Sequence, residues 1–453
     1  MDGKKTGRPP HVLWLLVAAA MGLRLAAVAV VDGPDLVPAS ESGLTAANWV
    51  AGRGYSFDFY GYRSDSPLQS FMPPLFTAVV AACLLTPWPA AVFHVLQAVL
   101  STLTVLLIYL VGERLAGRAV GLLAAGLTAV YPPFLVLVDQ PTVPALNTFL
   151  LALWLWAVLC LAGETGRSRP TAWAALAGLA LGLCALSRPS AVSLLAVTLV
   201  ALWLAPGARV RQWAVPALVT AVVLGLTVAP WLARGLWVHG RPVWISTNGG
   251  FSFWNGNNPF TTGSAFDVRV DDLEAYAPGS ISTADAGPIV QVKPYPLPLE
   301  LRDSVATLDE VALDRALYRS AFGFIREQPG RWLGLLGQKL ASLWWFRPNV
   351  GRSSGFYQEA WIGPYRLLYA AVLVTAGTGL LVSLKNWRRY VPLYGLFLTG
   401  SAVYVAYNAI TRYRWEMEPF LLVLAALALV TAARQLAAWR PARACLGAWG
   451  GRR

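Results

Sequence analysis

The sequence predicts an all-α polytopic membrane protein, a bundle of about eleven transmembrane helices. Of its 453 residues, 56% are hydrophobic and only 13% are charged, whereas a soluble domain carries roughly a quarter charged residues. The hydrophobic residues gather in blocks close to the ~20 residues that cross a bilayer as a helix. These blocks fall at about 11–31, 72–87, 91–112, 118–138, 143–163, 171–187, 190–205, 213–234, 363–384, 390–410 and 417–437.

The charged residues predict the orientation of these spans. The basic residues lie in short connectors, near 114–118, 167–169, 209–211 and 385–389, and at both termini, while the acidic residues gather in 32–65 and 267–327. This asymmetry is the positive-inside pattern of a membrane protein, and it argues against nucleic acid as the reason for the net charge of +13. We therefore expect a multi-pass protein of the cytoplasmic membrane whose two hydrophilic stretches, 32–70 and 235–345, face outward.

This orientation requires an odd number of crossings before the long hydrophilic stretch, but eight blocks precede it. The miscount falls between 72 and 112, where the block 72–87 is short and begins with Pro73 and Pro74. The number of spans there stays open. The first block lacks a small-residue cleavage site and is interpreted as a retained span. We expect three regions: 1–234 with the first outer loop at 32–70, an extracytoplasmic loop at 235–362 with interfacial helices, and C-terminal helices with a basic tail at 363–453.

The first outer loop contains the stretch SESGLTAANWVAGRGYSF, residues 40–57. Ser40 is placed to cap a short helix, and Glu41 would occupy its first turn, where the helix dipole favours a carboxylate. Two interpretations stay open for Glu41: stabilisation of the helix start, or a carboxylate at the membrane surface that accepts a proton from an incoming hydroxyl. Asp35 before this helix and Tyr55 after its glycine turn are candidate substrate contacts.

The long outer loop begins with STNGGFSFWNGNNPFTTG, residues 246–263. Side-chain amides beside aromatic rings suit a sugar, because amides bind hydroxyls and a ring covers the apolar face. The candidate contacts are Asn248, Trp254, Asn257 and Asn258; the alternative is an ordinary turn-rich loop. Further on, GQKLASLWWF predicts a helix at the membrane interface with Lys339 on its polar side, as another candidate contact.

Several arginines lie where the positive-inside pattern does not explain them. In NAITRYRWEMEPFLL, residues 408–422, Arg412 and Arg414 either pair with Glu416 or Glu418 or bind a lipid phosphate. Arg24 lies within the first apolar block, where an ionisable residue is either functional, paired or extended toward the interface. Arg188 has the same ambiguity, and Asp139 is a possible partner for one of these arginines.

The sequence offers no pattern for a metal centre or a disulfide framework. The four cysteines have no paired spacing, and the three histidines, His11, His94 and His239, are scattered. No phosphate-binding glycine loop and no nucleophile elbow is found. No metal ligand is therefore assigned.

Together these segments resemble the GT-C superfamily of membrane glycosyltransferases, which includes the protein O-mannosyltransferases and the aminoarabinose transferase of lipid A. The resemblance rests on SESGLTAANWVAGRGYSF with SFMPPLFTAVVAA, then LIYLVGERLAGRAVGLLAAGLTAVYPP, STNGGFSFWNGNNPFTTG and TRYRWEMEPFLLVLAALAL. With LDRALYRSAFGFIREQPGRWLGLLGQKLASLWWF, these stretches span most of the chain in the order of the family.

The resemblance implies a glycosyltransferase of the cell envelope. The family uses an acid in the first outer loop, which maps onto Glu41, seven residues before Asn48. It implies a sugar donor on a polyprenyl phosphate, a lipid, glycan or protein acceptor, and contacts from Asn248, Asn257, Asn258, Arg412 and Arg414. A single displacement from such a donor predicts inversion at the anomeric carbon.

The sequence departs from the family at two positions. Glu41 is followed by Ser42 instead of a second acid, and Val143 stands where the family often has Glu. A requirement for a divalent metal is therefore open. The alternatives are a secondary transporter of a lipid-linked or amphipathic substrate and a non-catalytic envelope-assembly protein.

Overall fold

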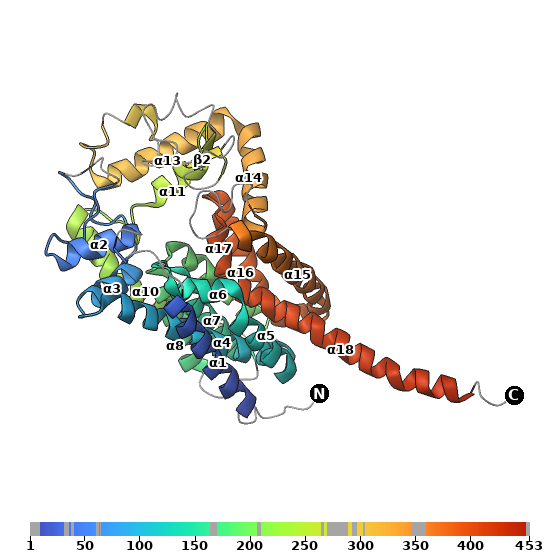
Figure 1. Cartoon of the computed structure of the whole chain (residues 1–453). Helices are drawn as coiled ribbons and strands as arrows, with labels where there is room; N and C mark the ends of the chain where they lie inside the picture. Colours follow the sequence, from blue (N-terminus) through green and yellow to red (C-terminus); the bar gives the residue numbers. More distant parts are fainter. Residues whose placement is uncertain are drawn as a thin grey trace.

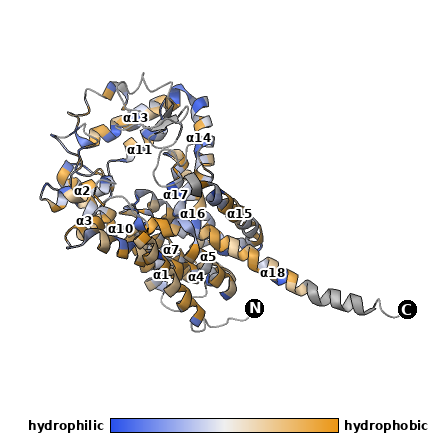
Figure 2. Ribbon diagram, viewed as in Figure 1, coloured by the Kyte–Doolittle hydropathy of each residue, from blue (hydrophilic) through white to orange (hydrophobic). Residues whose placement is uncertain are grey.

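The computed structural model describes residues 10–30, 36–37, 40–59, 63, 65–163, 170–205, 210–263, 267–269, 289–291, 297–301, 304–346 and 359–449. Within them the chain is almost entirely helical and has two parts (Figure 1). One part is a bundle of apolar helices. The other, here called the head, consists of the described residues within 40–73 and 240–346 and lies at one end of the bundle. Colouring by hydropathy separates the mainly hydrophobic bundle from the more hydrophilic head (Figure 2).

The bundle contains the membrane-spanning helices. Six stretches of the described chain are long and apolar enough to cross a membrane: His11–Val30, Pro89–Ala116, Pro144–Ala162, Gln212–His239, Ile362–Ala406 and Glu418–Ala438. A seventh is added if Arg118–Val130 and Pro132–Asp139, which bend by 55° at Tyr131, count as one span. The stretch Ile362–Ala406 is divided by a 3-10 turn, η5 (Leu384–Asn386). The polytopic all-α class is thus confirmed, whereas the count of eleven is not reproduced.

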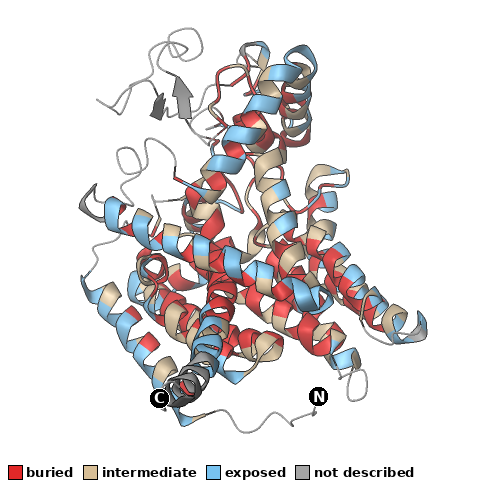
Figure 3. Ribbon diagram, turned by 90° about the vertical axis from the view of Figure 1, so that its right-hand side faces the viewer, coloured by how far each residue is buried: buried red, intermediate tan, exposed pale blue. Residues whose placement is uncertain are grey.

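The full bounds of the bundle helices are α1 His11–Val30, α3 Pro74–Leu84, α4 Pro89–Ala116, α5 Arg118–Val130, α6 Pro132–Val136, η1 Leu137–Asp139, α7 Pro144–Ala162, α8 Pro170–Ala185, η3 Pro189–Ser193, α9 Leu194–Trp203, α10 Val210–His239, α15 Glu359–Ser383, α16 Trp387–Ala406, α17 Thr411–Trp415 and α18 Glu418–Trp449. Buried residues fill the interior of the bundle, while many outer helix faces are exposed (Figure 3). Exposed leucines such as Leu226 and Leu367, at 67% and 76%, are what a surface solvated by lipid requires.

The doubtful block at 72–87 forms a helix too short to cross a membrane. Helix α3 has 11 residues, roughly 16 Å of helix against a hydrocarbon core of about 30 Å. Pro73 and Pro74 start it, and its Leu75 N donates to Leu186 O at 2.9 Å, at the end of α8. The next helix, α4, has 28 residues and accounts for the single long span of this region.

Small residues let several bundle helices pack closely. A Cβ on Gly112 of α4 would lie 2.8 Å from the Cα of Gly121 on α5, and one on Gly178 of α8 would lie 2.4 Å from Thr220 O on α10. Such contacts replace the hydrophobic driving force that is missing between helices in lipid. The glycines therefore set the spacing of the bundle that carries the head.

The head is built from α2 (Glu41–Val50), α11 (Gly249–Gly256), η4 (Leu299–Leu301), α13 (Glu310–Glu327), α14 (Pro329–Trp344) and the antiparallel pair β1 (Asp267–Arg269) and β2 (Ile289–Gln291). Its core joins the two hydrophilic stretches of the sequence, here called the first and second loops. Phe57, Phe59 and Phe71 of the first loop pack against Phe251 of the second, with the rings of Phe59 and Phe251 5.4 Å apart. The two loops thus fold as one unit.

Candidate functional site

Glu41 is the first residue of α2, at the start of a firmly held helix. Ser40 has extended backbone and its Oγ accepts from Gly43 N at 3.1 Å, as the sequence predicts. The inner face of α2 is buried, and a Cβ on Gly43 would lie 2.5 Å from Val37 O. The Glu41 side chain is partly exposed. The buried face of α2 therefore fixes the position from which the Glu41 carboxylate extends.

Tyr55 connects this helix to the bundle. Its side chain is buried, and its hydroxyl donates to Met72 O at 2.8 Å. Its ring meets Trp49 of α2 edge-on at 5.7 Å and Trp231 of α10 at 5.0 Å. Burial raises the pKa of the Tyr55 phenol well above its ordinary value. Tyr55 thus holds the end of α2 against the start of α3, and its bonds go to protein groups.

A buried carboxylate, Glu310 at the start of α13, fastens the first loop to the second. Its oxygens accept from Gln69 N at 2.6 Å, from Ser70 N at 2.8 Å and from the hydroxyl of Thr247. His239 Nε2, at the end of α10, lies 2.9 Å from Ser70 Oγ and 3.9 Å from Glu310. This junction was not predicted from the sequence, because its members are far apart along the chain.

Helix α11 starts against α13 through its glycines. Asp314 Oδ1 accepts from Gly250 N at 2.6 Å, so a carboxylate lies at the N-terminus of α11. Burial raises the pKa of Asp314 to about 6. Asn248 lies at the N-cap position without a side-chain cap and accepts from Ser246 Oγ at 3.2 Å. Trp254 is buried in the head core.

Asn257 and Lys339 are brought together, but inside the protein. Lys339 Nζ donates to Asn257 Oδ1 at 2.8 Å, and Trp332 Nε1 donates to the same oxygen at 3.1 Å. Asn257 Nδ2 donates to Phe253 O at 2.8 Å and to Ala406 O, at the end of α16, at 2.9 Å. The expected polar side for Lys339 is wrong: its side chain is fully buried, which lowers its pKa to about 7.

Asn258 is also fully buried and stabilises its own turn. Its Oδ1 accepts from Thr261 N at 2.8 Å and from Phe260 N at 3.1 Å. Its Nδ2 donates to Trp254 O at 2.9 Å. The dense amide pattern of the loop therefore serves its backbone at this position.

Of the two arginines near the last span, Arg414 is fully buried. Its Nε donates to Glu418 Oε1 at 2.7 Å and its Nη1 to Trp345 O at 2.7 Å. The guanidinium also covers the Tyr369 ring at 3.8 Å. Of the two alternatives that the sequence leaves open, pairing with a glutamate is the one found for Arg414, with Glu418. Arg412 is partly exposed.

Arg24 joins three helices of the bundle. Its Nε donates to Ser101 Oγ on α4 at 2.7 Å, and its Nη1 donates to Ala129 O on α5 at 3.2 Å and to Ala20 O at 3.0 Å. The interpretation as a paired residue within a span agrees with these contacts. Asp139 lies 3.5 Å from His94 Nε2. Asp35 falls outside the described residues.

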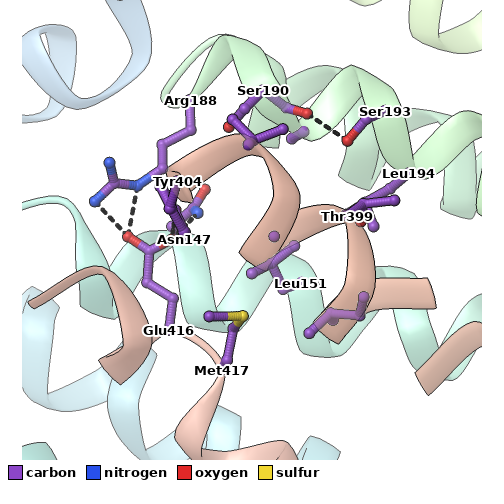
Figure 4. Close-up of a pocket in the computed structure, with 14 residues that line it drawn as sticks. Asn147, Leu151, Arg188, Ser190, Ser193, Leu194, Thr399, Tyr404, Glu416 and Met417 are labelled. Atoms are coloured by element: carbon purple, nitrogen blue, oxygen red, sulfur yellow. Dashed lines mark hydrogen bonds and ion pairs between the residues drawn. The ribbon is translucent and has the colours of Figure 1, made fainter. Parts of the chain in front are cut away.

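A second group of polar residues lines a pocket between α7, η3 and α16 (Figure 4). Arg188 donates through Nε and Nη2 to Glu416 Oε1, both at 2.5 Å. Glu416 Oε2 accepts from Asn147 Nδ2 at 2.6 Å and from the Tyr404 hydroxyl at 3.3 Å. In the sequence Arg188 and Glu416 stand out only separately. Asn147 is not among the predicted residues, although a polar residue inside a leucine-rich block is a usable signal.

The structure therefore separates the predicted site residues into groups. Glu41 and Tyr55 belong to the α2 platform, Asn257 and Lys339 to a buried contact of α11 with α14, and Arg414 and Arg24 to buried contacts elsewhere. In the described part of the chain, no three His, Cys, Asp or Glu residues lie close enough to hold a metal ion.

Comparison with known proteins gives a family match over part of the chain and a fold over almost all of it. Residues 67–233, a little over a third of the chain, match the dolichyl-phosphate-mannose-protein mannosyltransferase family. No curated protein sequence matches the chain.

Among solved structures, the oligosaccharyltransferase of Archaeoglobus fulgidus is similar in three states. With a tethered acceptor peptide it has a TM-score of 0.55 and 16% identity, over 96% of this chain and 51% of that one. In the apo form the TM-score is 0.56 at 16% identity, over 98% and 53%. With an inhibitory peptide and a dolichol-phosphate it is 0.53 at 16%, over 98% and 52%.

The chain thus spans about half the length of the oligosaccharyltransferase that it matches. The agreement covers almost all of this chain, so the order and arrangement of its helices is shared. The resemblance to GT-C transferases that the sequence suggests is confirmed. The chain is a multi-pass membrane protein with the fold of an oligosaccharyltransferase, and its residues 67–233 match the dolichyl-phosphate-mannose-protein mannosyltransferase family.

Proposed function

We propose that the protein is a membrane glycosyltransferase that moves a sugar from a polyprenyl-phosphate donor to a lipid, glycan or protein acceptor. The observation that carries the proposal is the shared fold over 96% of the chain, together with the mannosyltransferase match at residues 67–233. The related oligosaccharyltransferase is described with a dolichol-phosphate and with an acceptor peptide. A lipid-linked phosphate and a polar acceptor both suit a site between a membrane-embedded helix bundle and a polar head.

The proposed site lies on the outer face of the cytoplasmic membrane. With α3 too short to cross, α1 and α4 leave the N-terminus and the basic connector near 114–118 on one side of the membrane. The basic N-terminus and that connector favour the cytoplasm for this side, which assigns the head to the opposite side. In this arrangement residues 1–234 and 363–453 supply the bundle, and 235–362 supply the second outer loop.

The proposed reaction is a single displacement with Glu41 as the base. The acceptor hydroxyl oxygen attacks the anomeric carbon of the donor sugar and its proton passes to the Glu41 carboxylate. The bond between the anomeric carbon and the phosphate oxygen breaks, and its electron pair leaves with the polyprenyl phosphate. Attack opposite the leaving group inverts the anomeric carbon. A base at Glu41 would contribute roughly a hundredfold or more to the rate.

The first prediction is that Glu41→Gln abolishes transfer. The amide keeps the shape of the side chain at the start of α2 but cannot take up the proton, so transfer falls by about a hundredfold or more. Transfer of radiolabelled sugar from a polyprenyl-phosphate donor, by purified protein in lipid nanodiscs, measures the change.

The matched control is Glu300→Gln, which removes an exposed acid of the head that accepts from Ser320 Oγ. This variant should transfer at the unaltered rate, and both variants should keep the melting temperature of the parent. Full activity of Glu41→Gln would remove Glu41 from the reaction.

A further inference from the structure

Arg188 lies in the segment between α8 and α9, directly before η3, at one edge of the pocket in Figure 4. Its guanidinium is held on two sides. Glu416 takes two of its N–H groups, through Nε and Nη2, and the Tyr413 ring lies 4.9 Å from its central carbon. A guanidinium carries five N–H donors. The third nitrogen, Nη1, makes no hydrogen bond to the described part of the chain, and the side chain remains 18% exposed.

The pocket beside Arg188 is polar at the end of the ion pair and mainly apolar away from it. Ser190, Tyr404 and Asn147 lie near the ion pair. Leu151, Leu194 and Leu396 supply most of the remaining wall, which also includes Ser193 and Thr399. A ligand that fits both ends has a hydrogen-bond-accepting head and a hydrocarbon tail.

Arg188 is also tied to the platform that carries Glu41. Leu186 O, two residues earlier, accepts from Leu75 N at the start of α3. The residues just before Leu75, Met72 and Pro73, take the hydrogen bonds of Tyr55, which packs against the end of α2. A short chain of direct contacts therefore links the Arg188 segment to the helix of Glu41.

Three of the other cations considered for the donor phosphate are committed to the protein. Arg24, Lys339 and Arg414 are fully buried and donate to Ser101, Asn257 and Glu418 respectively. Releasing any of them would break a buried hydrogen bond, which is costly, although Asn257 Oδ1 would keep the bond from Trp332.

From this geometry we infer that Arg188 binds the phosphate of the polyprenyl carrier, with the first isoprene units in the apolar end of the pocket. The inference rests on the proposed function. Nη1 and the second N–H of Nη2 donate to phosphate oxygens, in the forked geometry that suits arginine. The stacking on Tyr413 and the bond to Glu416 fix the guanidinium before the ligand arrives, which lowers the cost of binding.

The negative charge of Glu416 weakens phosphate binding at this site but does not prevent it. The carboxylate accepts from Asn147 and Tyr404 as well as from Arg188, so its charge is shared among several donors and faces away from solvent at 2% exposure. Binding therefore depends on short-range donors and not on a large net charge. We expect the affinity to require the hydrocarbon tail as well as the phosphate.

The test is equilibrium binding of farnesyl phosphate, farnesol and inorganic phosphate to the full-length protein in detergent. The parent should bind farnesyl phosphate more tightly than either part-ligand. Arg188→Gln should weaken farnesyl phosphate binding by about tenfold or more, as expected for lost hydrogen bonds to a charged group. Arg326→Gln, which changes an exposed arginine of α13, is the matched control and should bind as the parent does.

Arg188→Gln also leaves Glu416 with fewer donors, so a second variant separates binding from folding. The double variant Arg188→Gln with Glu416→Gln replaces the ion pair by neutral amides. If Arg188 only supports the fold, the double variant recovers both the melting temperature and farnesyl phosphate binding, which overturns the inference. Recovery of the melting temperature without binding supports it.

The remaining outcomes are also decisive. A parent protein that binds inorganic phosphate as tightly as farnesyl phosphate, or that binds neither, overturns the assignment of a lipid phosphate. Because binding is measured without transfer, its failure is distinct from that of the proposed function. Binding through Arg188 without any sugar transfer would overturn the transferase proposal alone.

Discussion

Lys339 shows how burial changes the chemistry of one side chain. Its Nζ lies at the Asn257 amide and 3.5 Å from Ala406 O, without a carboxylate as an ion-pair partner in the described part of the chain. Its pKa falls to about 7 because the charged form loses water on burial. In the unfolded chain the same group titrates near ~10.4. Between these values the unfolded chain holds a proton that the native protein has released.

The stability of the protein should therefore rise with pH between about 7 and 10, by at most about 1.4 kcal/mol for each pH unit from this group. Below pH 7 both states carry the proton, and the contribution is constant. In Lys339→Met this pH dependence should disappear, and Asn257 Oδ1 keeps the bond from Trp332. Melting temperatures measured from pH 6 to 9 in detergent would show the change.

An exposed lysine provides the control for this experiment. Lys385→Met, in the η5 turn between α15 and α16, should leave the pH dependence of the melting temperature as it is in the parent. A parent-like rise with pH in Lys339→Met would show that Lys339 is not the group responsible.

The contacts of some of these residues are predictable from the local sequence, and those of others are not. Ser40 was identified as a helix cap from the residue types that follow it, because a cap depends only on neighbours within three or four positions. The protein partners of Asn257 are not predictable in this way, since its amide meets Ala406 and Lys339, 149 and 82 residues away. No local pattern specifies which distant backbone atoms an asparagine will meet.

At the scale of single elements, α11 depends on the absence of side chains at both ends. A Cβ on Gly256 would lie 1.9 Å from Tyr407 O, and one on Gly250 would lie 2.1 Å from Asp314 O. These distances are far below contact, so the short helix fits between α13 and the end of α16 only with glycine there. The glycines of the Asn/Gly-rich loop thus serve packing.

We predict that Gly256→Ala destabilises the protein, by about 1–3 kcal/mol, because the added methyl must push α11 away from Tyr407. The matched control is Gly323→Ala in the middle of α13, where an added Cβ meets nothing within 4 Å. That variant should be as stable as the parent or more so by roughly 0.5–1 kcal/mol, since alanine favours a helix. Chemical unfolding in mild detergent measures both, and equal behaviour would contradict the packing argument.

Elements of the bundle were predictable to the extent that they are long and apolar. The block at 11–31 corresponds to α1 and that at 91–112 to α4. The blocks at 171–187 and 190–205 became α8 and α9, of 16 and 10 residues, because hydropathy alone does not place a helix end. The pairing of Arg188 with Glu416 crosses 228 positions and has no local signal.

For the whole molecule, the short α3 determines which side of the membrane each loop occupies. If α3 does not cross, the turn between α3 and α4 lies on the same side as the head and opposite the connector between α4 and α5. Single cysteines at Trp88, Thr307 and Ala119 test this, since all three positions are exposed. The four native cysteines are first replaced by serine or alanine.

In intact cells a membrane-impermeant maleimide should label Trp88→Cys and Thr307→Cys but not Ala119→Cys until the membrane is opened. Labelling of Ala119→Cys together with Thr307→Cys, but not of Trp88→Cys, would mean that α3 crosses, because Trp88 and Ala119 lie at opposite ends of the span α4. Labelling of Ala119→Cys alone in intact cells would reverse the proposed orientation.

The Glu310 junction has a consequence for the order in which the protein matures during synthesis. The backbone N–H groups of Gln69 and Ser70 obtain their carboxylate partner from a residue 240 positions later, which leaves the ribosome long after them. The core that Phe57 and Phe71 share with Leu313 and Leu317 likewise forms only after the two leucines have been synthesised. The nascent first loop must therefore remain open while at least α4 to α10 are inserted, and Glu41 reaches its final setting only when translation has passed α13.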